Sequence, residues 1–407
     1  MKKKNYALTV KACFIGYIAQ AIVNNFVPLL FVTFNKTYGI PIEKITLLVT
    51  VNFVIQLCID ALSAKLISAI GYRASAIMAH VFSAVGLASL SFLPQILPDA
   101  FVGLMICVVV YAIGGGFIEV IISPIVEACP TDNKEKTMSL LHSFYCWGHV
   151  GVVLVSTAFF ALFGIDNWRI LALLWAIVPI FNVFLFAVVP IYKLEGDEPG
   201  SGSLKKLIKS GTFWLLMLMM VCAGASEQAV SQWASAFAET GLNVSKTLGD
   251  LLGPTMFALT MGVSRLIFGK FGEKMELEAY MLFSSCLCIC SYLMISLVSN
   301  PAIGLAGCAL CGFSVGIMWP GTYSNATKTL PFGGTAMFAL LALAGDIGCT
   351  AGPTLTGLVS GADGNLRAGV LIAIIFPALM LLSLVAFALM QKKKKPEPYE
   401  EQPSIDK

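Results

Sequence analysis

The sequence predicts an all-α membrane protein with twelve transmembrane helices. Charged residues make up only 12% of its 407 residues, whereas soluble proteins contain about 25%. Hydrophobic residues reach 57% and the mean hydropathy is +0.84, which excludes a soluble enzyme, a disordered chain and a nucleic-acid binder. Apolar stretches of about 20 residues, the length that crosses a bilayer, recur along the whole chain. Because backbone amides in lipid must be paired within their own segment, these stretches are expected to be helices.

Twelve segments meet this length criterion. The first is too long for a cleaved signal peptide, and we expect it to stay in the mature protein. No charge occurs between Glu278 and Lys328, and Ser299-Asn300-Pro301 supplies the turn that divides this stretch into two spans. The expected spans are 8–34, 45–69, 74–95, 99–127, 137–164, 168–192, 212–238, 247–270, 277–298, 302–329, 334–360 and 366–391.

Basic residues predict the orientation, because cytoplasmic loops carry an excess of Lys and Arg. With a cytoplasmic N-terminus, the outer ends hold only Lys36, Lys44, Arg169, Lys246 and Arg367, while the other Lys and Arg residues lie at inner ends. We therefore expect a multi-pass protein of the cell membrane, a bacterial inner membrane, with both termini cytoplasmic. The polar segment 193–211 is expected to be a cytoplasmic linker between six-helix bundles 1–192 and 212–391, and 392–407 a cytoplasmic tail.

The two halves share short patterns at nearly constant spacing. Gly116-Phe117 followed by Pro124 matches Gly312-Phe313 followed by Pro320, and Gly148-His149-Val150-Gly151 matches Gly345-Asp346-Ile347-Gly348. These pairs indicate two six-helix repeats. Transporters are commonly built from such repeats, with the solute bound near the midplane between them.

Twelve spans in two groups of six, a basic central linker and a Gly-basic element after spans 2 and 8 resemble the major facilitator superfamily over essentially the whole chain. Gly224-Ala225-Ser226-Glu227 with Trp233 in span 7, and Leu141-His142-Ser143-Phe144-Tyr145 in span 5, are similar to patterns of its fucose/sugar-permease-like branch. The resemblance implies a central cavity lined by spans 1, 4, 7 and 10. The acidic residue that braces the family's gate after span 2 is missing here, which leaves open how this gate is held. The gate candidates are Asp60, Lys65, Arg73, Arg265 and Lys274.

Four ionisable residues lie deep inside the expected spans. At 1.5 Å per residue, Glu119 lies about 12 Å from the inner end, His149 and Asp346 about 18 Å, and Glu227 about 22 Å. A charged side chain at such a depth costs about 2.5–3.5 kcal/mol and needs a reason. We expect one or two of these residues to exchange a proton with a water-filled cavity, although a polar contact between helices could also explain each.

Amide and aromatic side chains in spans 1, 7 and 10 could bind a solute. Amides bond hydroxyl groups, and an aromatic ring covers the apolar side of a sugar. As a set they favour a neutral, hydroxylated solute over a lipophilic drug, although helix-helix hydrogen bonding could explain any single one. The candidates are Gln20, Asn24, Asn25, Gln228, Gln232, Trp233, Trp319, Tyr323 and Asn325.

These features predict a secondary active transporter that moves a small polar solute, a sugar, by alternating access in symport with protons. Sodium is a possible alternative coupling ion. Two alternatives stay open: a proton-antiport exporter of drugs or metabolites, and a membrane sensor that transports nothing. No enzymatic activity, cofactor, metal or nucleic-acid partner is expected; the partners are the solute, the coupling ion and the lipid bilayer, and the protein is expected to be monomeric.

Overall fold

The computed structural model describes residues 6–131, 134–192, 201–271, 276–330, 333–361 and 365–394, and every regular element within them is helical. Twelve helical segments are long and apolar enough to cross a membrane. The predicted all-α fold and the predicted number of spans are therefore confirmed. The structural spans begin and end within several residues of the expected ones.

The N-terminal half contains the first six spans. Its elements are α1 (Tyr6–Asn25), η1 (Val27–Leu30), α2 (Phe31–Tyr38), α3 (Ile42–Ser89), α4 (Leu93–Ile96), α5 (Ala100–Glu127), α6 (Lys134–Phe163), η2 (Ile165–Asn167) and α7 (Trp168–Val188). α3 holds spans 2 and 3, which meet at Gly71. The φ of Gly71 is 79°, a left-handed conformation that glycine adopts without steric cost, and it allows the chain to turn between the two spans.

The C-terminal half follows the same plan with more interruptions. Its elements are α8 (Ser201–Ile208), α9 (Gly211–Ser231), α10 (Ala234–Ala236), η3 (Phe237–Gly241), α11 (Lys246–Asp250), η4 (Leu251–Thr255), α12 (Met256–Phe271), α13 (Leu277–Leu297), α14 (Pro301–Val315), α15 (Met318–Thr329), α16 (Gly334–Ser360), α17 (Leu366–Ala373) and α18 (Ile375–Lys394).

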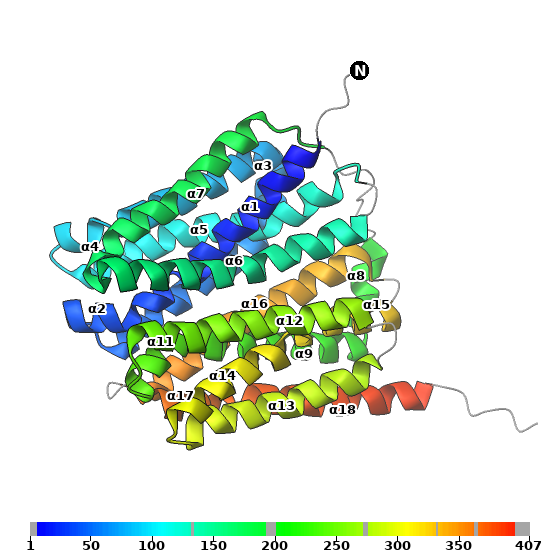
Figure 1. Ribbon diagram of the computed structural model, residues 1–407. Helices are drawn as coiled ribbons and strands as arrows, with labels where there is room; N and C mark the ends of the chain where they lie inside the picture. Colours follow the sequence, from blue (N-terminus) through cyan, green and yellow to red (C-terminus); the bar gives the residue numbers. More distant parts are fainter. Residues whose placement is uncertain are drawn as a thin grey trace, which may run out of the picture.

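Figure 1 shows α1 to α7 together in one part of the molecule and α9 to α18 in the other. α2 and α11 lie at the same end, at the left of the view, whereas the first turn of α1 and the last turn of α18 lie at the opposite end. For brevity, the end that carries α2 and α11 is called the α2 end below.

Prolines explain four of the breaks within spans. A proline has no N–H and its ring clashes with the carbonyl four residues earlier, so a helix tends to stop there. α1 ends one residue after Asn24, four before Pro28; α11 ends at Asp250, four before Pro254; α14 ends one residue before Gly316, four before Pro320; and α17 ends at Ala373, four before Pro377. Proline alone is not sufficient, because Pro124, Pro179 and Pro353 lie inside continuous helices.

The breaks leave backbone carbonyls without their usual helical partners. The carbonyl of Asn24 would accept from the N–H of residue 28, and that of Gly316 from residue 320, but both of those residues are prolines. These two acceptors, in the middle of spans 1 and 10, therefore lack the N–H donor that a continuous helix would supply. Both are used by side chains of the site described below.

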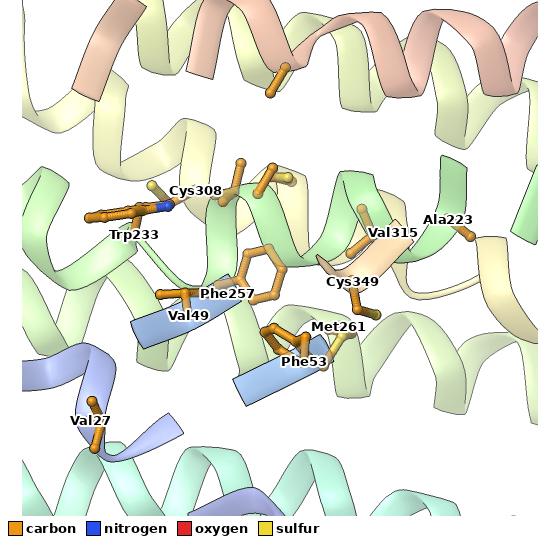
Figure 2. Close-up of a cluster of buried hydrophobic side chains, with 14 of the residues drawn as sticks. Val27, Val49, Phe53, Ala223, Trp233, Phe257, Met261, Cys308, Val315 and Cys349 are labelled. Atoms are coloured by element: carbon orange, nitrogen blue, oxygen red, sulfur yellow. The ribbon is translucent and has the colours of Figure 1, made fainter. Parts of the chain in front are cut away.

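The apolar core extends across both halves. It includes Val27, Val49 and Phe53 from the N-terminal half and Trp233 and Phe257 from the C-terminal half. Figure 2 shows these side chains in one region, together with Met261, Cys308 and Cys349. Contacts between the halves gather at the α2 end, and all residues in 19–32 and 222–238 are buried. The two halves are therefore closed against each other at the α2 end.

Three contacts hold this closure. Lys36 Nζ lies 2.7 Å from Glu239 Oε1, and the hydroxyls of Thr50 and Thr354 lie 2.6 Å apart. The ring of Phe31 in α2 lies 5.1 Å from that of Trp233. Each contact joins an element of the N-terminal half to one of the C-terminal half, so all three must break when the halves separate at this end.

Candidate functional site

Four carboxamide side chains of α1 and α3 form a buried hydrogen-bonded network. Gln20 Nε2 donates to Gln56 Oε1 at 2.9 Å, and Gln56 Nε2 donates to Asn24 Oδ1 at 2.9 Å and to Asn52 Oδ1 at 3.0 Å. Asn52 Nδ2 also reaches Asn24 Oδ1 at 3.3 Å. Gln20 and Asn24, like Asn52 and Gln56, are four residues apart, which places each pair on one helix face. We call these four residues the amide network.

The amide network continues into the C-terminal half through a proline-freed carbonyl. Gln232 Nε2 donates to the backbone oxygen of Asn24 at 3.2 Å and to Gln228 Oε1 at 3.0 Å. Gln228 Nε2 donates in turn to Glu227 Oε1 at 3.2 Å. Asn24 can accept this bond because Pro28 offers its carbonyl no N–H. The polar chain therefore crosses from one half of the protein to the other inside the membrane-spanning region.

Glu227 is neutralised by an arginine. Arg265 Nη2 lies 3.4 Å from Glu227 Oε2, Nη1 lies 3.1 Å from the sulfur of Cys146 in α6, and Nε lies 3.4 Å from the free carbonyl of Gly316. Cys146 belongs to the N-terminal half, so the guanidinium also bridges the halves. A buried pair of opposite charges needs no further ion, because each charge compensates the other.

A second group consists of three acidic residues, and two of them, unlike Glu227, have no arginine within ion-pair distance in the described part of the chain. Asp60 of α3, Glu119 of α5 and Asp346 of α16 place one carboxylate oxygen each within 4.8 Å of one another. We call these three residues the carboxylate cluster. Asp346 belongs to the C-terminal half and the other two to the N-terminal half. Among the residues that the structure describes, no Lys, Arg or His lies within ion-pair distance of Glu119 or Asp346.

The carboxylate cluster can hold a proton or a cation. Three carboxylate oxygens lie within 4.8 Å of one another, and carboxylates this close repel each other unless at least one carries a proton. Three carboxylate oxygens are also suitable ligands for a hard cation such as sodium. Gln20 Nε2, at 3.4 Å from Glu119 Oε2, joins the carboxylate cluster to the amide network.

The structure brings together six of the predicted residues: Gln20, Asn24, Glu119, Glu227, Gln228 and Gln232. Asp346, a seventh predicted residue, joins them through the carboxylate cluster. The structure adds Asp60 and Arg265, which the sequence had suggested only for the gate. His149 is 2% exposed in α6, and in the described part of the chain it bonds neither the amide network nor the carboxylate cluster.

The remaining predicted solute ligands make their contacts outside the amide network, and two of them, Trp319 and Tyr323, lie beside the carboxylate cluster. Asn25 donates to the Ala21 carbonyl at 2.9 Å, and Asn325 faces Met281 of α13 at 3.4 Å. Trp233 is fully buried and its Nε1 donates to the Pro353 carbonyl at 3.0 Å, so its ring packs between helices. Trp319 and Tyr323 are half-buried on α15, with ring centroids 6.5 Å apart, and Trp319 lies against Gly345, next to Asp346.

The remaining gate candidates have varied positions. Arg73 donates to the carbonyls of Phe186, Ala187 and Val189 at 2.7–2.9 Å, so it caps the C-terminal end of α7. The side chain of Lys65 and the whole of Lys274 lie outside the described residues. Arg73 therefore binds a helix end.

Several polar residues of the site were not predicted. Asn52 and Gln56 lie in the middle of span 2, and their spacing of four residues was a visible signal. Asp250 of α11 is fully buried and lies 2.8 Å from Lys246 Nζ, while Thr157 of α6 reaches it at 3.5 Å. This pair lies toward the α2 end and adds a further contact between the halves.

Comparison with known families agrees with this architecture. The family model described as the Major Facilitator Superfamily matches residues 12–344. The chain belongs to this superfamily. It is therefore a multi-pass membrane transporter and not an enzyme, as the sequence predicted.

Solved structures of transporters share the fold at low sequence identity. The E. coli fucose:proton symporter is 16% identical with a TM-score of 0.64, covering 94% of this chain and 99% of that one. A D-xylose-proton symporter is 12% identical with a TM-score of 0.76, covering 94% and 97%. A bacterial homologue of the human lysosomal transporter Spinster, in an inward-facing conformation, is 13% identical with a TM-score of 0.76, covering 98% and 100%. Among curated protein sequences, none matches the chain.

Proposed function

We propose that this transporter moves a small, neutral, hydroxylated solute, a sugar or a compound of similar polarity, into the cell in symport with protons. The observation that carries the proposal is the carboxylate cluster, which is built from both halves of the protein and joined to the amide network. Amides exchange hydrogen bonds with hydroxyl groups at small net cost, so a hydroxylated solute can replace amide-amide bonds one for one.

The charge distribution separates two roles. Glu227 has Arg265 as a partner, whereas Glu119 and Asp346 have no basic partner among the described residues. We therefore assign proton coupling to Glu119 and Asp346, with Asp60 as the third member. Glu227 keeps Arg265 and Gln228 in position beside the solute.

The carboxylate cluster links ion binding to movement. Bringing Asp346 of the C-terminal half against Glu119 of the N-terminal half without a proton or a cation would place like charges together in a medium of low dielectric constant. Protonation removes this repulsion and allows the halves 1–192 and 212–391 to approach. The distribution of Lys and Arg favours an orientation in which the α2 end faces outward. In this orientation the linker 193–211, the tail 392–407 and both termini lie in the cytoplasm.

Several neighbours in the fold carry related solutes. The structures named above include symporters of fucose and of D-xylose with protons. Their identities to this chain are low, and they support the choice of test solutes without naming the one that is carried.

The test is uptake by purified protein in proteoliposomes, using labelled fucose and D-xylose, with uridine as a neutral, hydroxylated compound that is not a simple sugar. We expect saturable accumulation of at least one sugar when an inward proton gradient is imposed, and no accumulation with a sodium gradient alone. In the Asp346→Asn variant, accumulation should fall to background while exchange of labelled for unlabelled solute continues. Accumulation driven by sodium would replace the proton as coupling ion, and loss of preloaded solute on an inward proton gradient would indicate an antiport exporter.

A further inference from the structure

Gln20 connects the carboxylate cluster to the amide network through one carboxamide. Its Nε2 lies 3.4 Å from Glu119 Oε2 and 2.9 Å from Gln56 Oε1. The side chain is almost fully buried, and its Oε1 has no hydrogen-bond partner. This oxygen points toward Gly115 of α5, where an added Cβ would lie 3.2 Å from it. A buried polar atom without a partner is costly and requires an explanation.

The charge on Glu119 decides which end of the Gln20 amide can face it. An ionised carboxylate only accepts hydrogen bonds, so the amide must present its N–H groups and leave Oε1 aside. A protonated carboxyl donates through its O–H, and the amide oxygen then becomes the better partner. A half-turn about the last side-chain bond of Gln20 exchanges the two ends, and such terminal torsions are broad and nearly two-fold.

We propose that Gln20 is a positioning residue that reports the protonation of Glu119 to the amide network. One proton from the cavity binds the Glu119 carboxylate, and the new O–H donates to Gln20 Oε1 after the half-turn. The half-turn puts Gln20 Oε1, an acceptor, where Nε2 had been, 2.9 Å from Gln56 Oε1. The two oxygens repel each other, so the Gln56 amide moves away and its Oε1 is free to accept from a hydroxyl of the solute. The solute therefore binds more tightly when Glu119 is protonated. This inference rests on the proposed function and adds the residue that couples ion and solute.

The groups around Glu119 leave the orientation of the Gln20 amide to depend on whether Glu119 itself is protonated. Among the described residues, none of the titratable groups that face Glu119 is basic. They come from five helices: Tyr17 of α1, Asp60 of α3, Tyr145 of α6, Tyr323 of α15, and Asp346 and Cys349 of α16. No neighbouring cation in this set could hold Glu119 ionised while the amide turns.

A matched control exists on the other side of the amide chain. Gln228 also donates from Nε2 to a glutamate, at 3.2 Å from Glu227, but that glutamate is paired with Arg265. Glu227 should therefore stay ionised, and the amide of Gln228 should not turn when the pH changes.

The first experiment needs no solute. Infrared difference spectra of the reconstituted protein are recorded between mildly alkaline and mildly acidic pH. We expect the carbonyl stretch of the Gln20 amide to move to lower frequency on acidification, because Oε1 gains a hydrogen bond. The band is assigned by its loss in Gln20→Met, or in Gln20→Asn if the first variant does not fold. It should stay fixed in Glu119→Gln, and the Gln228 band, assigned with Gln228→Met, should not move.

The second experiment measures the apparent affinity for whichever of labelled fucose, D-xylose and uridine is carried. In the wild type, affinity should weaken by about tenfold from acidic to alkaline pH, the effect of about one hydrogen bond. In Gln20→Met, no side chain at position 20 donates to Gln56 Oε1 at any pH, so affinity should stay near the acidic wild-type value and be independent of pH. An equal loss at every pH, with the wild-type profile retained, would show a purely structural role and overturn the proposal.

The two experiments test the proposed role of Gln20, here called the relay, independently of the proposed transport function. A Gln20 band that ignores pH overturns the relay even if a sugar is accumulated with protons. A band that moves only when Glu119 can titrate supports the relay even if none of the three test solutes is carried, and in that case the proposed function fails alone.

Discussion

Replacing Asp346 by asparagine should reduce the dependence of stability on pH. The substitution keeps the size of the side chain and removes one of the three ionisable groups that lie within 4.8 Å of one another. At this distance and an effective dielectric constant of about 20, two ionised carboxylates repel each other by about 3.5 kcal/mol. That energy is a large part of the total stability of a folded protein, so the folded carboxylate cluster must keep protons that the unfolded chain releases.

The sign follows from this difference in bound protons. Because the folded state binds more protons than the unfolded state, the free energy of unfolding falls as the pH rises, by about 1.4 kcal/mol per pH unit for each proton retained. The asparagine introduced in place of Asp346 cannot ionise, so one such proton is no longer needed. The wild type should lose stability from mildly acidic to mildly alkaline pH, and Asp346→Asn should lose about 1.4 kcal/mol less per pH unit.

The assay is thermal unfolding of the purified protein in detergent, followed by tryptophan fluorescence across this pH range. Asp250→Asn is the matched control, because Asp250 is also a buried acid of the C-terminal half but has Lys246 at 2.8 Å. Removing its charge leaves the lysine without its partner and should lower the unfolding temperature at every pH. If Asp346→Asn behaves like this control, with a parallel loss at all pH values, the repulsion argument is wrong.

Two further predictions concern the ion pairs. Glu227→Gln or Arg265→Met alone should destabilise the protein by about 3–5 kcal/mol, because each variant leaves one charge without its partner. In thermal unfolding, the double variant should recover most of this loss, and additive losses would contradict the pairing of the two residues. Lys36→Ala should change stability by less than about 1 kcal/mol, since the Lys36 side chain is 67% exposed. With Glu239 retained, the same change should raise labelling of a cysteine placed at the neighbouring, fully buried Ala238 by a membrane-impermeant reagent; unchanged labelling would show that the pair does not help to close the α2 end.

Most of the fold could be predicted from the sequence because membrane spans depend on length and polarity alone. The turn at Gly71 and the division at Ser299-Asn300-Pro301 were also visible, since Gly and Pro mark chain reversals. The interruption of span 7 after Ser231 was not predictable, because no proline lies there. It coincides with two tertiary contacts, the bonds from Gln232 to Asn24 and from Trp233 to Pro353, which only the folded structure contains.

The site was predicted residue by residue but not as an arrangement. Depth in the membrane singled out Glu119 and Asp346, but depth does not show which helix faces which, so their meeting with Asp60 could not be foreseen. Arg265 was placed near the inner end from its position in the sequence. Its long side chain carries the guanidinium to Glu227, and sequence position describes only the Cα atom.

The proline-freed carbonyl of Asn24 suggests how the halves can be joined without being locked, while that of Gly316 holds Arg265, whose guanidinium also reaches Cys146 of the N-terminal half. Asn24 accepts from Gln232 at 3.2 Å and Gly316 accepts from Arg265 at 3.4 Å, and the same side chains reach Gln228 and Glu227. Single hydrogen bonds between membrane helices contribute only about 0.6 kcal/mol on average, so such contacts can break and form again during each cycle. A free carbonyl also remains satisfied by water once the cavity opens. Pro28 thus frees an acceptor that joins the halves in the closed state and can release its donor in the open state, whereas Pro320 frees one that positions Arg265 within the C-terminal half.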